Sequence, residues 1–153
     1  MKTIMIICIA PVEQLQPAID EAVSLGYRIV FCGDKMYPFE VVPVERRYQI
    51  RWDDTERITE IARAEKVDGI LAEVPACAPY AAMAARKLGL SCNSPEGLAA
   101  LNNKSSFRSI LKRAGVFCPA YYRAVEKEDL WNCCADMRLP LIVKPEECSS
   151  SRE

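Results

Sequence analysis

The sequence predicts an α/β fold, with an open parallel Rossmann-like sheet flanked by helices and followed by the incomplete start of a second domain. Short apolar runs alternate with stretches of helical periodicity along the first ninety residues, a rhythm typical of parallel sheets with right-handed crossovers. The first run, residues 4–10, is apolar on both faces, as strands at the centre of a parallel sheet are. Glycines follow several helical stretches, where helix C-caps belong.

The first part of the chain divides into strands and helices by these patterns. After the strand at 4–10 we expect a helix over 11–25 that ends at Gly26, and then a strand over 27–32. A short strand over 48–51 and a helix starting at Asp53, Asp54 or Thr55 come next. The series continues with a strand over 69–74, a helix over 79–88, and a short strand or extended link over 90–92.

The pattern changes near residue 94. Ser94 and Pro95 are typical of a helix start, and Asn103 begins a further helix that ends at Gly115. A helix over 126–137 and an apolar strand over 141–143 follow. We therefore expect one α/β domain over residues 1–101 and the opening segment of a second domain over 102–153.

Composition excludes several classes of function. The 153 residues contain no histidine, which removes Ser-His-Asp and Cys-His catalysis and histidine metal sites. The eight cysteines form no C-x-x-C pair, so we expect no metal site, reduced thiols and a cytoplasmic location. The net charge of −1 gives no general attraction to nucleic acid, and no run approaches the roughly 18 apolar residues of a membrane span.

The last fifteen residues carry the strongest candidate site. Lys144 ends the expected strand over 141–143, and a small hydroxyl-rich loop with a further cation follows it: Ser149, Ser150, Ser151 and Arg152. A cation beside such a loop can hold phosphate oxygens. The catalytic residues stay unknown.

A weaker candidate lies at the carboxyl ends of the predicted strands. Small ligands of open parallel sheets bind at this edge, and Asp34 and Glu73 are its polar residues. The alternative is that both are solvated loop carboxylates. No G-x-G-x-x-G turn follows the first strand, which argues against a dinucleotide there.

An ordered set of motifs resembles the ATP-grasp superfamily. Its blocks are Ala81-Ala-Met-Ala-Ala-Arg-Lys-Leu-Gly-Leu90, Ser94-Pro-Glu-Gly, Asn103-Lys104-Ser-Ser-Phe-Arg108, Ala114-Gly115-Val116 with Pro119, and Leu139-Pro140-Leu-Ile-Val-Lys144-Pro145. Residues 1–101 resemble the preATP-grasp domain, and residues 102–153 resemble the start of the ATP-grasp domain. Among its members, the chain looks closest to bacterial amino-acid ligases and carbamoyl-phosphate-synthase-like proteins.

The resemblance implies an ATP-dependent carboxylate–amine ligase that works through an acyl phosphate. Its small-molecule substrates would be a carboxylate and an amine. Lys104 and Lys144 match the family lysines that contact the nucleotide phosphates, and Ser149–Ser151 with Arg152 match the loop that folds over them. Phosphoryl transfer depends on positioning and charge neutralisation, which suits lysines without histidine.

Several departures limit this reading. Asn103 stands where the family has aspartate, and Glu146 and Glu147 precede the loop where the family has glycines; two carboxylates would repel a polyphosphate unless they face away or hold a cation. The family's Mg²⁺ ligands would lie outside this chain, so we expect this polypeptide alone not to catalyse ligation. The strand over 141–143 would leave an exposed sheet edge, a route to a homodimer.

Two alternatives remain open. One is a non-catalytic preATP-grasp-like module that binds a small molecule or a partner subunit. The other is a flavodoxin-like or Rossmann-like domain with a helical tail, in which Lys104 and Lys144 have no joint role. We predict that Lys104 and Lys144 face the same cleft, within reach of one triphosphate; side chains that point to opposite faces would end the ligase reading.

Overall fold

The computed structural model describes residues 1–9, 12–34 and 44–146. The chain forms two compact units, one over Met1–Ala99 and a second that begins at Ala100.

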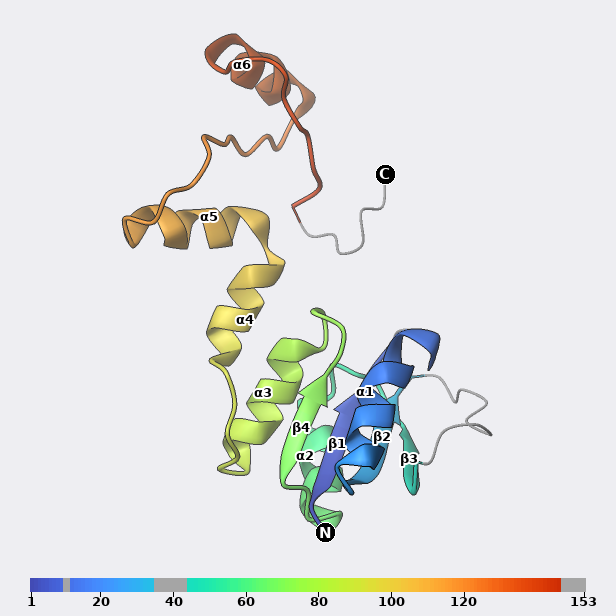
Figure 1. Ribbon diagram of the computed structural model, residues 1–153. Helices are drawn as coiled ribbons and strands as arrows, with labels where there is room; N and C mark the ends of the chain where they lie inside the picture. The colour runs from blue at the N-terminus through green and yellow to red at the C-terminus, as the bar shows by residue number, and fades with distance from the viewer. Residues whose placement is uncertain (10–11, 35–43, 147–153) are drawn as a thin grey trace. The chain divides into compact units, whose positions relative to one another are not determined.

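The first unit is built on a parallel sheet of four strands in the order β3-β2-β1-β4. The strands are β1 (Thr3–Ile7), β2 (Arg28–Gly33), β3 (Arg46–Gln49) and β4 (Gly69–Ala72), shown in Figure 1. β1 lies in the middle, with Met5 opposite Val30 of β2 on one side and Ile70 of β4 on the other. The predicted α/β fold with an open parallel sheet is confirmed.

Helices cover both faces of this sheet (Figure 1). The helix α1 (Val12–Ser24) packs on one face, while α2 (Thr55–Ala64) and α3 (Ala78–Lys87) pack on the other. Alternate residues of β1 point to opposite faces, as the pleat of a strand requires. Thus Ile6 joins the α1 side, and Met5 and Ile7 join the α2 and α3 side.

The centre of the sheet is fully apolar, which is why its strands read as continuous hydrophobic runs. Met5, Ile6, Ile7 and Val30 have no exposed surface. Burying each such side chain contributes about 1.5–3 kcal/mol. Gly33, at the end of β2, leaves room for the neighbouring strand, because a Cβ there would lie 2.7 Å from the carbonyl oxygen of Cys8.

The expected caps form at the ends of the helices. The carboxylate of Asp54 accepts a hydrogen bond from the Arg57 N–H at 3.0 Å and caps α2. Gly26 and Gly89 follow α1 and α3 with positive φ angles of 71° and 70°, a conformation that glycine adopts at little cost. Residues 90–92 form an extended link and no strand.

An outer strand of the sheet is short and charged. β3 has four residues, and its sequence Arg46-Arg47-Tyr48-Gln49 exposes both arginines. Edge strands of this kind are poor templates for pairing with another sheet.

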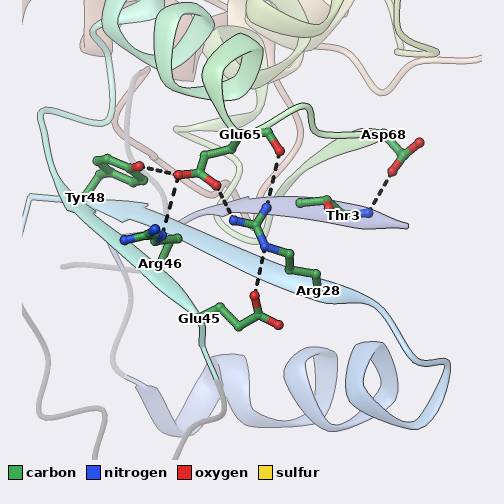
Figure 2. A network of polar contacts seen from close by, with 7 residues as sticks. All are labelled: Thr3, Arg28, Glu45, Arg46, Tyr48, Glu65 and Asp68. Atoms are coloured by element: carbon green, nitrogen blue, oxygen red, sulfur yellow. Dashed lines mark hydrogen bonds and ion pairs between the residues drawn. The ribbon is translucent and has the colours of Figure 1, made fainter. Parts of the chain in front are cut away.

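Ion pairs connect the amino ends of β2 and β3 to each other and to α2 (Figure 2). The Arg28 guanidinium at the start of β2 pairs with Glu45 at 2.9 Å and with Glu65 at the end of α2. Glu65 also accepts a hydrogen bond from the Tyr48 hydroxyl and lies 4.0 Å from Arg46. One half-buried carboxylate thereby joins α2 to both β2 and β3.

Helices dominate the described part of the second unit. They are α4 (Pro95–Asn102), which crosses the unit boundary, α5 (Lys104–Arg113) and α6 (Lys127–Asp136). The Ser94 hydroxyl accepts the Gly97 N–H at 3.1 Å, as its predicted cap position requires. Within the described ranges, none of the helices has the length and apolar character needed to cross a membrane.

The predicted strand over residues 141–143 is wrong. These residues are irregular, and the side chains of Ile142 and Val143 are 80% and 75% exposed. A strand needs a neighbour to satisfy its backbone groups, and residues 100–146 contain no other strand. The sheet edge expected there is absent, so the argument for a homodimer that rested on it falls.

Candidate functional site

A cavity of about 730 Å³ in the second unit is lined by both candidate lysines. Lys104, at the start of α5, and Lys144, in the irregular stretch after α6, both line it. The two lysines are forty positions apart in the sequence. The chain returns to this cavity after α6, which places Lys144 in the same lining as Lys104. The sequence indicated that the two side chains should face one cleft, and this cavity is where the structure places them.

The lining of this cavity carries an excess of positive charge. Two of its residues are carboxylates, Glu126 and Glu146. Six are cations: Lys104, Arg108, Arg123, Lys127, Arg138 and Lys144. Converging cations with few carboxylates attract oxyanions and disfavour cations. The cavity therefore suits a ligand with several negative oxygens.

Apolar and aromatic residues complete the lining. Leu130 and Met137 contribute from α6 and the residue that follows it, and Tyr121 and Tyr122 contribute from the stretch before it. A cavity with both apolar walls and a cationic region can take a ligand that has an aromatic part and an anionic part. These lining properties fit ATP, which has both parts.

Glu146 organises the cationic end of the site. Its carboxylate accepts a hydrogen bond from Arg123 Nε at 3.0 Å, and its backbone carbonyl accepts the Lys104 N–H at 3.3 Å. The Ser105 hydroxyl is the largest cause that lowers the pKa of the Glu146 carboxyl, and Arg123 and Asn103 lower it further. Glu146, two residues along the chain from Lys144, thus ties the start of α5 to Arg123.

These contacts also show why the Glu146 carboxylate need not repel a bound polyphosphate. A free carboxylate beside a polyphosphate would be unfavourable, but the Glu146 charge is matched by the Arg123 guanidinium. Glu147, the second carboxylate of concern, lies outside the described residues.

The start of α5 is well defined. Asn103 caps it, with its side-chain oxygen accepting the Ser106 N–H at 2.8 Å. One turn later Arg108 lies over the Tyr121 ring, 5.5 Å from its centroid, a cation–π contact. The Tyr121 hydroxyl is 3.0 Å from the Ser109 hydroxyl. These contacts hold residues 119–123 along α5.

The weaker candidates, Asp34 and Glu73, lie at the carboxyl edge of the sheet in the first unit. Asp34 follows β2 and is exposed, while Glu73 follows β4 and is half-buried. Burial raises the pKa of the nearby Cys77 thiol to about 12, with smaller contributions from Cys8 and from three carboxylates: Asp34, Asp53 and Glu73. No cluster of three or more metal-ligating side chains occurs in residues 1–9, 12–34 and 44–146.

The remaining candidates are Ser149, Ser150, Ser151 and Arg152, which lie outside the described residues. Sequence reasoning missed the role of Arg123 as the partner of Glu146. The two residues are 23 positions apart in irregular segments, where no periodicity signals contact.

Solved structures show which group of enzymes this chain resembles. The L-amino acid ligase from Bacillus licheniformis matches 97% of this chain with a TM-score of 0.77 and 26% identity. The chain resembles the N-terminal part of ATP-grasp enzymes. This confirms the resemblance that the motifs predicted. No family model and no curated protein matches the sequence.

Two further structures show the same ATP-grasp likeness at the level of the fold. The N5-carboxyaminoimidazole ribonucleotide synthetase from Thermotoga maritima matches 86% of this chain, with a TM-score of 0.66 and 18% identity. The phosphoribosylglycinamide synthetase from Anaerococcus prevotii matches 91%, with a TM-score of 0.67 and 14% identity. The chain covers 38%, 36% and 35% of the lengths of the three structures.

Proposed function

We propose that this chain is the nucleotide-binding N-terminal part of an ATP-dependent carboxylate–amine ligase. The observation that carries the proposal is the shared cationic cavity that Lys104 and Lys144 line. Support also comes from the ATP-grasp likeness, which includes a Staphylococcus aureus N5-carboxyaminoimidazole synthetase structure complexed with ADP at 19% identity and a TM-score of 0.66.

In this proposal the lysines neutralise and position the phosphates. Lys104 and Lys144 would contact the polyphosphate, while Arg123 stays paired with Glu146 and keeps the start of α5 in place. The serine loop, Ser149–Ser151 with Arg152, would close over the phosphates. Phosphoryl transfer requires little covalent help from the protein, so such positioning accounts for much of the catalysis.

ATP supplies the phosphoryl group that activates the carboxylate as an acyl phosphate, which the amine then displaces. Mg²⁺ would accompany the nucleotide, and we place its protein ligands outside this chain, as the resemblance implies. The chain by itself would therefore bind nucleotide without completing ligation. At the sheet edge, Asp34 and Glu73 are our candidates for contacts with the small-molecule substrate.

The test is the effect of Mg-ATP on the melting temperature. A ligand that binds the native state alone raises stability by RT ln(1 + [L]/Kd), about 2.7 kcal/mol at one hundred times Kd. We expect Mg-ATP to raise the melting temperature of the native chain, and Lys144→Ala and Lys104→Ala each to reduce that rise strongly.

Lys2→Ala is the matched control, because it removes the same charge from an exposed residue of the first unit. It should leave the rise unchanged. Absence of any rise in the native chain would contradict nucleotide binding and favour a non-catalytic module that binds another small molecule or a partner subunit. An equal rise in melting temperature in the Lys144→Ala and Lys2→Ala variants would show that Lys144 does not contribute to nucleotide binding.

A further inference from the structure

A second cavity of about 860 Å³ lies along α5 in the second unit. It shares Ser105, Tyr121, Arg123 and Glu146 with the cavity described above. Lys104 and Lys144 do not line it. The pair Arg123–Glu146 therefore lines both cavities, and the proposed nucleotide site accounts for only one of them.

This second cavity is rich in hydroxyl groups and cations. Ser105, Ser106 and Ser109 contribute hydroxyls, and Lys112 and Arg113 contribute charge from the last turn of α5. Glu146 is its one carboxylate, and Arg123 already balances that charge. Lys112 and Arg113 are exposed, and neither forms an ion pair with a carboxylate in the described part of the chain.

Cations in the last turn of a helix are often explained by the free carbonyls there. At α5 the backbone already satisfies three of these carbonyls. Ala114 N donates to Ile110 O at 2.9 Å, Gly115 N donates to Lys112 O at 3.2 Å, and Val116 N donates to Leu111 O at 3.0 Å. The two side chains are thus not required as caps, and their charge remains available to a ligand.

We infer that this cavity is a separate binding site for a small molecule that carries phosphate or carboxylate groups. The cations attract the oxyanion, and the Ser106 hydroxyl can donate a hydrogen bond to one of its oxygens. The Tyr121 ring forms part of the wall, held by the Ser109 hydroxyl at 3.0 Å and by Arg108 on its face. The site does not depend on nucleotide binding at Lys104 and Lys144.

The experiment follows the backbone amide signals of Ser106 and Ser109 by NMR while inorganic phosphate or citrate is added at constant ionic strength. We expect saturable shifts in the native chain. In the double variant Lys112→Gln/Arg113→Gln, the apparent Kd should rise at least tenfold. The double variant Lys2→Gln/Arg63→Gln removes equal charge, including one cation from the last turn of α2, and should titrate like the native chain.

A third variant separates this site from the nucleotide cavity. Lys104→Ala/Lys144→Ala should keep the shifts of Ser106 and Ser109, even if Mg-ATP no longer binds. Shifts that are absent, that do not saturate, that persist unchanged in Lys112→Gln/Arg113→Gln, or that vanish in Lys104→Ala/Lys144→Ala would each overturn the inference. Tighter binding of citrate than of phosphate would assign the site to carboxylates, and the reverse would assign it to phosphate esters.

Discussion

The Arg123 guanidinium and the Glu146 carboxylate meet at 3.0 Å, and this pair forms a wall common to two cavities of the second unit. Both residues belong to irregular segments, which have no ladder or helix to hold them in place. The pair supplies that restraint, and the Lys104 N–H adds to it by donating to the Glu146 carbonyl.

The first prediction concerns this restraint. Replacing Arg123 by Ala should speed hydrogen exchange at the Lys104 amide, because Glu146 would lose the partner that keeps its carbonyl beside α5. The measurement is native-state amide exchange by NMR. Arg57→Ala, which removes an exposed arginine from an ion pair with Glu60, should leave the Lys104 amide unchanged, and equal acceleration in both variants would contradict the role of Arg123.

The second prediction concerns the carboxylate that joins α2 to the sheet in Figure 2. Glu65→Gln should lower the free energy of unfolding by about 1–3 kcal/mol, because the largely buried Arg28 guanidinium loses a charged partner. Urea denaturation measures this change. Glu60→Gln alters an exposed pair and should change stability by no more than about 0.5 kcal/mol; a similar loss in both variants would refute the importance of Glu65.

The third prediction concerns how the contribution of Glu65 to the free energy of unfolding depends on pH. Hydrogen bonds from Tyr48 and Arg28 lower the pKa of the Glu65 carboxyl below its ordinary value of 4.5. The native state therefore binds this proton less readily than the unfolded chain does. Its contribution to stability is fully present well above pH 4.5 and is lost as the pH falls through the native pKa.

Unfolding free energies measured between about pH 6 and pH 3 check this sign. The native chain should lose more stability over this range than Glu65→Gln does, so the two curves should converge as the pH falls. Parallel curves would show that Glu65 contributes nothing to the acid sensitivity.

The fourth prediction concerns the cysteines. Burial is the main cause that raises the pKa of the Cys32 and Cys77 thiols to about 12. Cys8, which follows β1, is also fully buried. Since the thiolate is the reactive form, iodoacetamide at pH 8 should spare these three residues. The exposed Cys92 and Cys134 should react.

Mass spectrometry of the labelled chain, before and after unfolding in urea, distinguishes the two groups. Unfolding should make all of these thiols reactive. Rapid labelling of Cys32 in the native chain would show that the sheet opens readily, contrary to its complete burial.

Local signals in the sequence were sufficient to predict most of the helices and strands of the first unit. The apolar runs at β1 and β2 and the cap residues Asp54 and Gly26 act over a few positions, so periodicity and propensity locate them. The prediction that Lys104 and Lys144 face one cleft came from a resemblance and not from local pattern, and the structure shows both lysines in the lining of one cavity.

What the sequence could not supply are contacts between distant irregular segments. Residues 141–143 have the apolar, β-branched character of a strand, yet strand formation depends on a neighbour that local pattern does not specify. Arg28 and Glu65 are 37 positions apart, and Arg123 and Glu146 are 23 apart. Only the folded chain shows that these charges meet.

The arginines of β3 affect how readily two copies of the chain can associate through this strand. A second copy that approached this strand edge to edge would bring its own arginines close to these two, and like charges close together oppose such pairing. We therefore expect the β3 edge to resist the strand-to-strand association of copies that builds fibres.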